Sequence, residues 1–252
     1  RSNTSPTGWS KNIIKLFFYK YFLKLADDVM VNSKSFKKEF LKKFGIKVKY
    51  IYNPFDKNFI KKKILNSKKD NFFKNETLNL ISIGRLTDQK DHLTLLESLR
   101  FVDLKLKPRL MIIGKGNNLS KLREYTNIHN LKKIVKFTGY LKNPYGNILN
   151  SKIVILTSRF EGLPNILIEA QFLKKYIIST DCPTGPKEIL LNGLAGDLTK
   201  VGDSKKLSNL INNYHNNKKN ISKQIKIGSK SLNRFDYKKN CKLYLNFVIN
   251  NF

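Results

Sequence analysis

The sequence contains few of the residues that bind metals or carry out redox chemistry. It has two cysteines, Cys182 and Cys241, and three histidines, His92, His129 and His215, in 252 residues, and none of these lies close to another. Metal sites need such ligands at short spacings, as in C-x-x-C pairs. A catalytic cysteine needs a histidine partner, and no partner is evident. We therefore expect no metal site and no reactive thiol, and the low cysteine content suits a reducing compartment.

A long apolar run is also missing. The most apolar segment, residues 9–25, is WSKNIIKLFFYKYFLKL, and four lysines interrupt it. A transmembrane helix needs about 20 predominantly apolar residues, so this segment does not span a bilayer. Its mixture of aromatic, aliphatic and lysine residues is typical of a helix lying at a membrane surface. A helix packed inside a domain explains the pattern equally well, and the sequence leaves both interpretations open.

Acidic residues are scarce, with 18 against 49 basic residues, and the net charge is +31. Between residues 34 and 69 there are 13 lysines and two acids. Such a density attracts polyanions, either nucleic acid or anionic lipid. Arginine is scarce, no common nucleic-acid-binding module is recognisable, and the aromatic residues follow no stacking motif. We therefore favour an anionic membrane surface as a partner over nucleic acid.

The chain is long enough, and with 40% hydrophobic residues apolar enough, to bury a sizeable core. Strand-like and helix-like segments alternate over residues 78–198. This pattern predicts an α/β fold with a Rossmann-like, mostly parallel sheet and helices on both faces. No Walker-type G-x4-G-K-[ST] sequence is present.

One candidate anion site is a helix start within residues 158–190, SRFEGLPNILIEAQFLKKYIISTDCPTGPKEIL. Proline fits the first turn of a helix, so Leu163, Pro164 and Asn165 predict a helix entry, and Ile166 begins an apolar stripe. The free backbone N–H groups and the positive end of the helix dipole attract an anion, and Gly162 lets the backbone come close to it. This arrangement suits a pyrophosphate.

Two glutamates bracket that helix start. Glu161 and Glu169 are eight positions apart, which at about 1.5 Å per helical residue is on the order of 10 Å. That span is comparable with the distance from a ribose to a hexose across a diphosphate, so one carboxylate can serve each sugar. Alternatively, Glu161 is a helix-start carboxylate stabilised by the dipole and Glu169 is a solvated surface residue.

A second candidate site follows an apolar strand. Residues 78–83, LNLISI, end in the loop GRLTDQK at 84–90, and helical spacing begins after it. Arg85 and Lys90 flank this loop, so both cations could reach phosphate oxygens at the carboxyl edge of the sheet. In so basic a chain, Lys90 alone could equally be a solvated helix-start lysine.

Together these two segments resemble the signature of glycosyltransferase family 4. In that family a strand-end G-R-L-x-x-x-K sequence, here residues 84–90, precedes an E-x7-E sequence, here residues 161–169. Residues 110–114, LMIIG, look like the next strand, residues 135–139, VKFTG, like the loop that receives the base, and residues 181–189 like a late loop. The resemblance extends from about residue 26 to the C-terminus.

The resemblance implies a GT-B fold, in which an acceptor domain precedes a donor domain. Residues 1–55 would be a remnant of the acceptor domain, most of which is missing, 56–235 the Rossmann-like donor domain, and 236–252 a C-terminal cross-over helix. We expect helices at residues 10–25, 35–44 and 237–252, and strands at 29–31 and 48–52. Asn53, Pro54, Phe55 and Asp56 resemble the hinge into the donor domain.

The resemblance also implies a function. The enzyme would be a retaining, metal-independent transferase that moves a hexose or N-acetylhexosamine from a nucleotide-sugar, with a UDP-sugar as our choice, to a glycan or lipid-linked acceptor. It would act in bacterial surface polysaccharide or lipopolysaccharide synthesis, as a cytoplasmic protein held peripherally at the inner face of the membrane. The absence of any D-x-D sequence agrees with metal independence, and no cofactor besides the donor is expected.

The site residues carried over from the family have distinct roles. Arg85 and Lys90 would neutralise the departing diphosphate, Glu161 would orient the hexose, and Glu169 would accept hydrogen bonds from the ribose. The further donor-binding residues are Gly84, Gly139, Tyr140, Leu141, Gly162, Leu163, Pro164, Asn165 and Ile166. Since family members also use residues of the first domain, we expect this chain alone to be inactive. The alternative is a non-catalytic basic module that binds anionic lipid or nucleic acid on a degenerate transferase domain.

Overall fold

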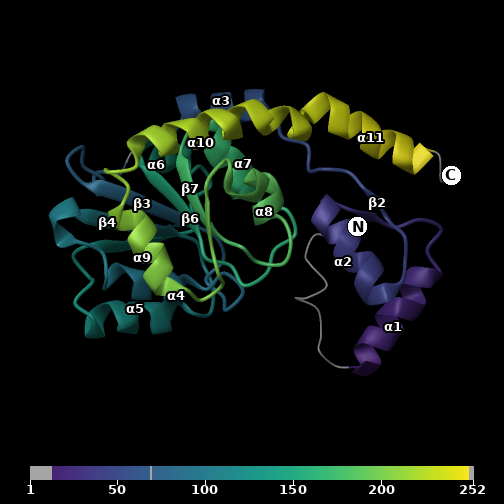
Figure 1. The fold of residues 1–252 in the computed structure, drawn as a ribbon, viewed down its shortest axis with the longest axis horizontal. Coiled ribbons are helices and arrows are strands. Elements are labelled where there is room, and N and C mark those ends of the chain that lie inside the picture. Colours follow the sequence, from purple (N-terminus) through teal and green to yellow (C-terminus); the bar gives the residue numbers. More distant parts are fainter. Residues whose placement is uncertain (1–12, 69, 250–252) are drawn as a thin grey trace.

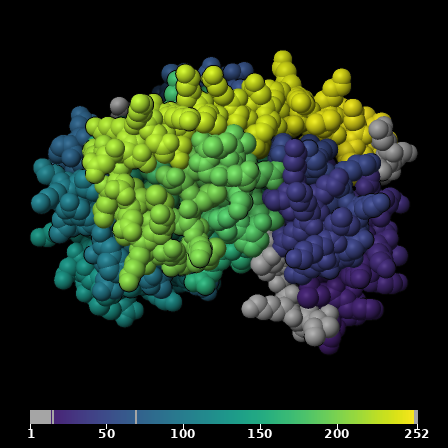
Figure 2. All heavy atoms as spheres, viewed as in Figure 1, coloured from purple at the N-terminus to yellow at the C-terminus, as the bar shows by residue number. Residues whose placement is uncertain are grey.

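The computed structural model describes residues 13–68 and 70–249. A large lobe is built around one parallel sheet, and a smaller N-terminal segment lies beside it (Figure 1). The C-terminal helix α11 (Tyr237–Ile249) runs along one side of the molecule from the large lobe to the N-terminal segment. The two parts face each other below this helix (Figure 2).

The large lobe contains six strands in the order β5-β4-β3-β6-β7-β8, and every pair of neighbours is parallel. They are β3 (Leu78–Ile83), β4 (Pro108–Ile113), β5 (Val135–Gly139), β6 (Ile153–Leu156), β7 (Tyr176–Thr180) and β8 (Asp197–Thr199). The chain builds the sheet outward from β3 to one edge, then returns and builds from β6 to the other edge. Ligands of such folds bind where the direction of building changes, which is here between β3 and β6.

Helices cover both faces of this sheet, as predicted. Successive strand residues point to opposite faces, so Leu80 belongs to one buried cluster and its neighbour Ile81 to the other. One face is covered by α4 (His92–Leu99), α5 (Leu119–Ile128), α9 (Ser204–Asn212) and part of α10 (Lys218–Lys230). The other is covered by α3 (Lys57–Leu65), α6 (Tyr145–Asn150), α7 (Asn165–Phe172) and α8 (Pro186–Ile189). Burial on both faces explains why the four central strands β3, β4, β6 and β7 are mostly apolar.

The N-terminal segment has a small core of its own. It consists of α1 (Ile13–Lys24), β1 (Met30–Val31), α2 (Lys34–Phe44) and β2 (Lys49–Tyr50), with β1 and β2 parallel. The three phenylalanines of α2 fill the space between the helix and the two strands. Ser33 accepts a hydrogen bond from the Phe36 amide at the start of α2, and Gly45 ends the helix with a positive φ of 68°. These features confirm the expected order of helices and strands.

Some of the predicted boundaries need correction. Strand β2 ends at Tyr50 instead of residue 52, because Tyr52 and Asn53 turn towards the large lobe and bind there. Residues 135–139, predicted as a loop, form the edge strand β5. Residues 181–189, also predicted as a loop, end in the short helix α8, which begins with Pro186. The predicted helix residues 10–12 and 250–252 lie outside the described residues.

The chain crosses between the two parts at two adjacent places. The Phe55 amide donates to the Phe235 carbonyl at 2.8 Å, and Phe55 and Asp236 form a parallel bridge. Helix α11 follows directly, and the hydroxyl of its Tyr244 donates to the Ile51 carbonyl at 3.1 Å. The hinge and the C-terminal helix therefore lie side by side. The domain boundaries themselves stay a prediction.

Candidate functional site

The candidate site lies where the loops after β3 and β6 meet. The two strands are neighbours, with Ile81 opposite Val154, so the loops leave the same edge of the sheet. Hydrogen bonds join the loops, among them Arg159 amide to Gln89 carbonyl at 2.8 Å, Gln89 Nε2 to Phe160 carbonyl at 3.0 Å, and Thr157 hydroxyl to Lys90 carbonyl at 3.1 Å. The two sequence segments that we singled out thus form one structural unit.

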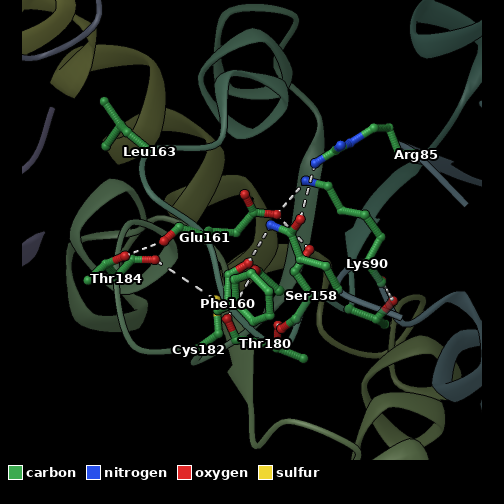
Figure 3. Close-up of polar contacts among 12 residues, drawn as sticks. Arg85, Lys90, Ser158, Phe160, Glu161, Leu163, Thr180, Cys182 and Thr184 are labelled. Atoms are coloured by element: carbon green, nitrogen blue, oxygen red, sulfur yellow. Dashed lines mark hydrogen bonds and ion pairs between the residues drawn. The ribbon is translucent and has the colours of Figure 1, made fainter. Parts of the chain in front are cut away.

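Lys90 and Glu161 form an ion pair in this unit (Figure 3). Lys90 Nζ lies 2.5 Å from Glu161 Oε1, and the side chains are 16% and 8% exposed. The Ser158 hydroxyl donates to the same carboxylate oxygen at 2.6 Å. The aliphatic part of Lys90 lies against Gly84, where an added Cβ would be 3.3 Å from the lysine Cδ. Glycine therefore leaves room for this lysine to reach the carboxylate.

Arg85 lies at the open side of this pair. It is exposed, and its Nη2 donates to Gln89 Oε1 at 3.3 Å. In Figure 3 the guanidinium points towards the ends of Lys90 and Glu161. Two cations thus flank one carboxylate, so the cluster carries a net positive charge that can attract an anion. The three residues predicted to act in catalysis lie together.

The predicted helix entry is the start of α7. Pro164 is the N-cap residue, and no side chain caps this helix end. Behind it, Gly185 approaches so closely that an added Cβ would be 2.3 Å from the Gly162 carbonyl oxygen, and its φ is +88°. Asn53 of the hinge donates to the Leu163 carbonyl at 3.3 Å and to Asn165 Oδ1 at 2.8 Å. The loop before α7 is thereby fixed from two sides, with uncapped N–H groups at the helix start.

Glu169 lies in a separate cavity of about 240 Å³, whose lining includes neither Lys90 nor Glu161. This cavity is bordered by the hinge residues, by Tyr145 of α6 and by Tyr237 of α11. Burial raises the pKa of Glu169 to about 7, although a hydrogen bond with Tyr145 lowers it. Glu169 is therefore a carboxylate that changes its charge near neutral pH.

The residues predicted to hold the base follow the edge strand β5. Gly139 has a φ of +74° at the end of this strand, Tyr140 is exposed, and Leu141 lines a further cavity of about 350 Å³. Two strands, β4 and β3, separate β5 from β6. These residues therefore lie apart from the Lys90 and Glu161 pair along the same edge of the sheet.

Four residues of the site were missed at the level of sequence. The Ser158 hydroxyl donates to the Glu161 carboxylate, and the Gln89 side chain donates to the Phe160 carbonyl of the other loop. The Thr184 hydroxyl donates to the Glu161 carbonyl, and Tyr145 lies beside Glu169. Ser158 is three positions before Glu161, a spacing that could have indicated a local hydrogen bond. The other three contacts join distant parts of the chain and carry no local signal.

Neither a metal centre nor a membrane-spanning helix is found in the described part of the chain. Within residues 13–68 and 70–249, no three histidine, cysteine, aspartate or glutamate side chains are grouped so as to hold a metal ion. Over the same ranges, every helix is too short or too polar to cross a bilayer.

The sequence matches a known protein family. Residues 63–244 match the family described as glycosyl transferases group 1. An uncharacterized glycosyltransferase of Methanocaldococcus jannaschii is 38% identical over 189 residues, which are 72% of this chain and 46% of the relative. An N-acetylgalactosaminyltransferase of Campylobacter jejuni, whose name gives a diphospho-undecaprenol-linked acceptor, is 28% identical over 207 residues, 79% of this chain and 54% of the relative. The chain spans about half the length of these curated relatives.

Solved structures share the fold. The crystal structure of Anabaena HepE with UDP superimposes with a TM-score of 0.82 at 20% identity, covering 98% of this chain and 70% of HepE. The lipopolysaccharide outer core galactosyltransferase WaaB, in its apo form, superimposes with a TM-score of 0.70 at 24% identity, covering 91% of this chain and 64% of WaaB. At these identities the likeness concerns the fold alone.

Proposed function

Because the chain belongs to the group 1 glycosyl transferases, family 4 with a GT-B fold, we propose that it binds the donor of a retaining, metal-independent sugar transfer. The donor is a UDP-linked hexose or N-acetylhexosamine, and the acceptor is a glycan or a lipid-linked saccharide in bacterial surface polysaccharide synthesis. The whole protein is the enzyme in this proposal, and this chain supplies its donor site.

The single observation that carries the proposal is the cluster of Arg85, Lys90 and Glu161 at the point where the sheet changes direction. Transfer from a nucleotide-sugar places positive charge on the sugar ring and negative charge on the departing diphosphate. Two cations fixed beside the leaving group stabilise that negative charge without a metal ion. The uncapped N–H groups at the start of α7 add to this effect.

In this proposal, donor binding changes the partner of Lys90. The ammonium is bound to Glu161 in the structure, and the diphosphate replaces the carboxylate when the donor binds. The Glu161 carboxylate is then free to accept hydrogen bonds from the sugar hydroxyls. Glu169, in its separate cavity, accepts from the ribose, and Gly139, Tyr140 and Leu141 hold the base. We assign no covalent role to Glu161.

The choice of UDP is supported by the related proteins. A relative of Escherichia coli, 27% identical over 217 residues, is named as a transferase that uses UDP-Gal. HepE was crystallised with UDP-glucose as well as with UDP. Both comparisons concern other proteins, and the donor of this chain follows from them only as a proposal.

Contact with an anionic membrane surface is part of the same proposal, with a cytoplasmic location at the inner face of the membrane. Helix α1 exposes Phe17 (66%) and Phe22 (62%), and Leu25 directly after it is 65% exposed. Lys20 and Lys24 stand between these residues in the sequence. Co-sedimentation with phosphatidylglycerol vesicles but not phosphatidylcholine vesicles is expected, and Phe17→Ser with Phe22→Ser should reduce it. Unchanged binding by this variant would favour the alternative, in which α1 packs within a domain.

The test of the donor assignment is calorimetric titration of the purified chain with UDP, GDP and ADP, first without metal and then with EDTA. Selective binding of UDP that EDTA does not affect is expected. Binding that requires a divalent ion, or equal binding of all three nucleotides, would contradict the proposal. A folded chain that binds no nucleotide but binds anionic vesicles would favour the non-catalytic module.

A further inference from the structure

Glu188 of α8 is bound almost entirely by the N-terminal segment. Its carboxylate accepts hydrogen bonds from the Lys34 amide at 3.0 Å, the Ser35 amide at 2.8 Å, the Ser35 hydroxyl at 2.8 Å and the Tyr52 hydroxyl at 2.5 Å. All four donors belong to residues more than 130 positions earlier in the chain. One carboxylate of the large lobe thus binds both the start of α2 and Tyr52, which follows β2.

The Glu188 carboxylate lies where the start of α2 lacks hydrogen-bond acceptors. Lys34 and Ser35 are the first residues of α2, where the backbone N–H groups lack partners within the helix and the dipole favours negative charge. Glu188 therefore acts as a helix cap supplied by another part of the chain. Burial, together with the hydrogen bond to Glu188, raises the pKa of Tyr52, so its hydroxyl remains a donor.

Helix α8 is itself joined to the loop that carries Glu161. The Thr184 hydroxyl, just before α8, donates to the Glu161 carbonyl, and Gly185 lies directly against the Gly162 carbonyl. On the other side, the Arg234 guanidinium donates to the Glu188 carbonyl at 2.9 Å and to the Ile189 carbonyl at 3.0 Å. A displacement of Glu188 would therefore move the loop as well as the short helix.

Asn53 of the hinge, the residue after Tyr52, holds the loop that carries Glu161 from its other end. Tyr52 binds Glu188, while Asn53 donates to the Leu163 carbonyl and to the Asn165 side chain. Two neighbouring residues thus contact both flanks of residues 161–165. These contacts connect the N-terminal segment with residues 161–165.

We propose that Glu188 is a positioning residue of the donor site, which couples the position of α2 to the placement of the Glu161 carboxylate. It does not touch the donor, and it acts through Thr184 and Gly185. The consequence for sugar binding rests on the proposed function, whereas the coupling itself can be tested without any ligand.

The ligand-free test uses backbone amide NMR of the full chain. Glu188→Gln keeps the shape of the side chain but removes its charge, and Tyr52→Phe removes one donor if the first variant does not fold. The amide resonances of Gly162 and Leu163 are expected to shift in these variants and to stay in place in Glu124→Gln, an exposed glutamate of α5. Shifts confined to residues 33–35 and 186–189 would overturn the coupling.

The binding test compares UDP with a UDP-hexose. Because Glu161 is assigned to the hexose, Glu188→Gln should weaken UDP-hexose binding by about threefold to tenfold while changing UDP binding less. Thr184→Val should have a similar effect. In the double variant, the loss of binding free energy for the UDP-hexose should be smaller than the sum of the two single losses, because both residues act on the same loop. Equal losses for UDP and UDP-hexose, or none, would refute Glu188 as a positioning residue and leave the proposed function intact. If the unchanged chain binds neither ligand, the proposed function fails, and the amide shifts still decide the coupling.

Discussion

Lys90 and Glu161 form a largely buried ion pair, with Nζ 2.5 Å from Oε1, although 71 positions separate them in the sequence. Each residue is assigned to a different part of the donor, the lysine to the phosphate and the glutamate to the sugar. In the proposed mechanism the bound donor separates this pair, so that each side chain contacts its own part of the ligand. Removing one partner of such a pair leaves the other charge without compensation.

Glu161→Gln should separate the two roles. The substitution removes the negative charge that competes with phosphate for Lys90, so UDP should bind about twofold to tenfold more tightly. A UDP-hexose should no longer bind more tightly than UDP, because the glutamine amide replaces the charged acceptor of the sugar hydroxyls. Calorimetry with both ligands measures this, and weaker UDP binding by a folded Glu161→Gln chain would show that the pair does not compete with the ligand.

Arg85→Ala should weaken UDP binding by about 1 to 3 kcal/mol, the range for loss of a charge-assisted hydrogen bond. Because Arg85 is exposed and its hydrogen bond to Gln89 is long, at 3.3 Å, the melting temperature should hardly change. Arg100→Ala, at an exposed arginine beyond the end of α4, is the matched control for the change in net charge. Equal losses of UDP binding free energy in Arg85→Ala and Arg100→Ala would mean that Arg85 acts only through the overall charge of the chain.

Glu169→Gln should change the pH dependence of stability. The folded pKa of Glu169 is raised from the ordinary value of 4.5 to about 7, so the folded state binds the proton more tightly than the unfolded state. Its contribution to stability is fully present below pH 4.5 and is lost as the pH rises to 7. At pH 8 the glutamine variant should therefore be more stable than the unchanged chain, by up to about 3 kcal/mol. Denaturant unfolding at pH 4.5 and pH 8 tests this, with Glu124→Gln as control.

The same carboxyl group should make UDP binding dependent on pH. In the proposed site, ribose hydroxyls donate to the ionised form of Glu169, so UDP binding should strengthen as the pH rises through 7 and should release a proton. Calorimetry in buffers of different ionisation enthalpy detects that proton. A pH profile that is identical in Glu169→Gln would remove Glu169 from the ribose site.

Gly185→Ala should destabilise the chain more than Gly202→Ala. Both glycines have positive φ, +88° and +79°, so both substitutions introduce backbone strain of about 1 kcal/mol. At Gly185 the new Cβ would lie 2.3 Å from the Gly162 carbonyl oxygen, which is too close. At Gly202 no atom lies within 4 Å of the new Cβ. We expect an additional loss of roughly 1 to 3 kcal/mol at Gly185. Equal unfolding midpoints for the two variants would contradict the close approach.

The sequence predicted the mostly parallel sheet with helices on both faces and the strand that ends just before Arg85. These features depend on local apolar runs and on motifs that stand at the ends of strands, and both can be recognised in a linear sequence. Strand β3 agrees with its prediction at both ends, Leu78 and Ile83. The site assignments to individual parts of the donor stay predictions.

Other features could not be predicted because they arise from contacts between distant segments. Strand β2 ends early because Tyr52 binds Glu188, 136 positions later. Residues 135–139 form a strand because β4 offers a free edge for pairing, although their sequence, VKFTG, is only partly apolar. The separate cavity of Glu169 depends on the hinge and on Tyr145, whose positions follow from the packing of α6.

The most direct test of the account is the structure of this chain bound to UDP, with the distance from Lys90 Nζ to the nearest β-phosphate oxygen as the measurement. We predict a distance below about 3.2 Å, as in a charge-assisted hydrogen bond, with Lys90 detached from Glu161 and Arg85 on the same phosphate. A diphosphate bound elsewhere on the chain, or at this site with the Lys90 and Glu161 pair still closed, would contradict the account.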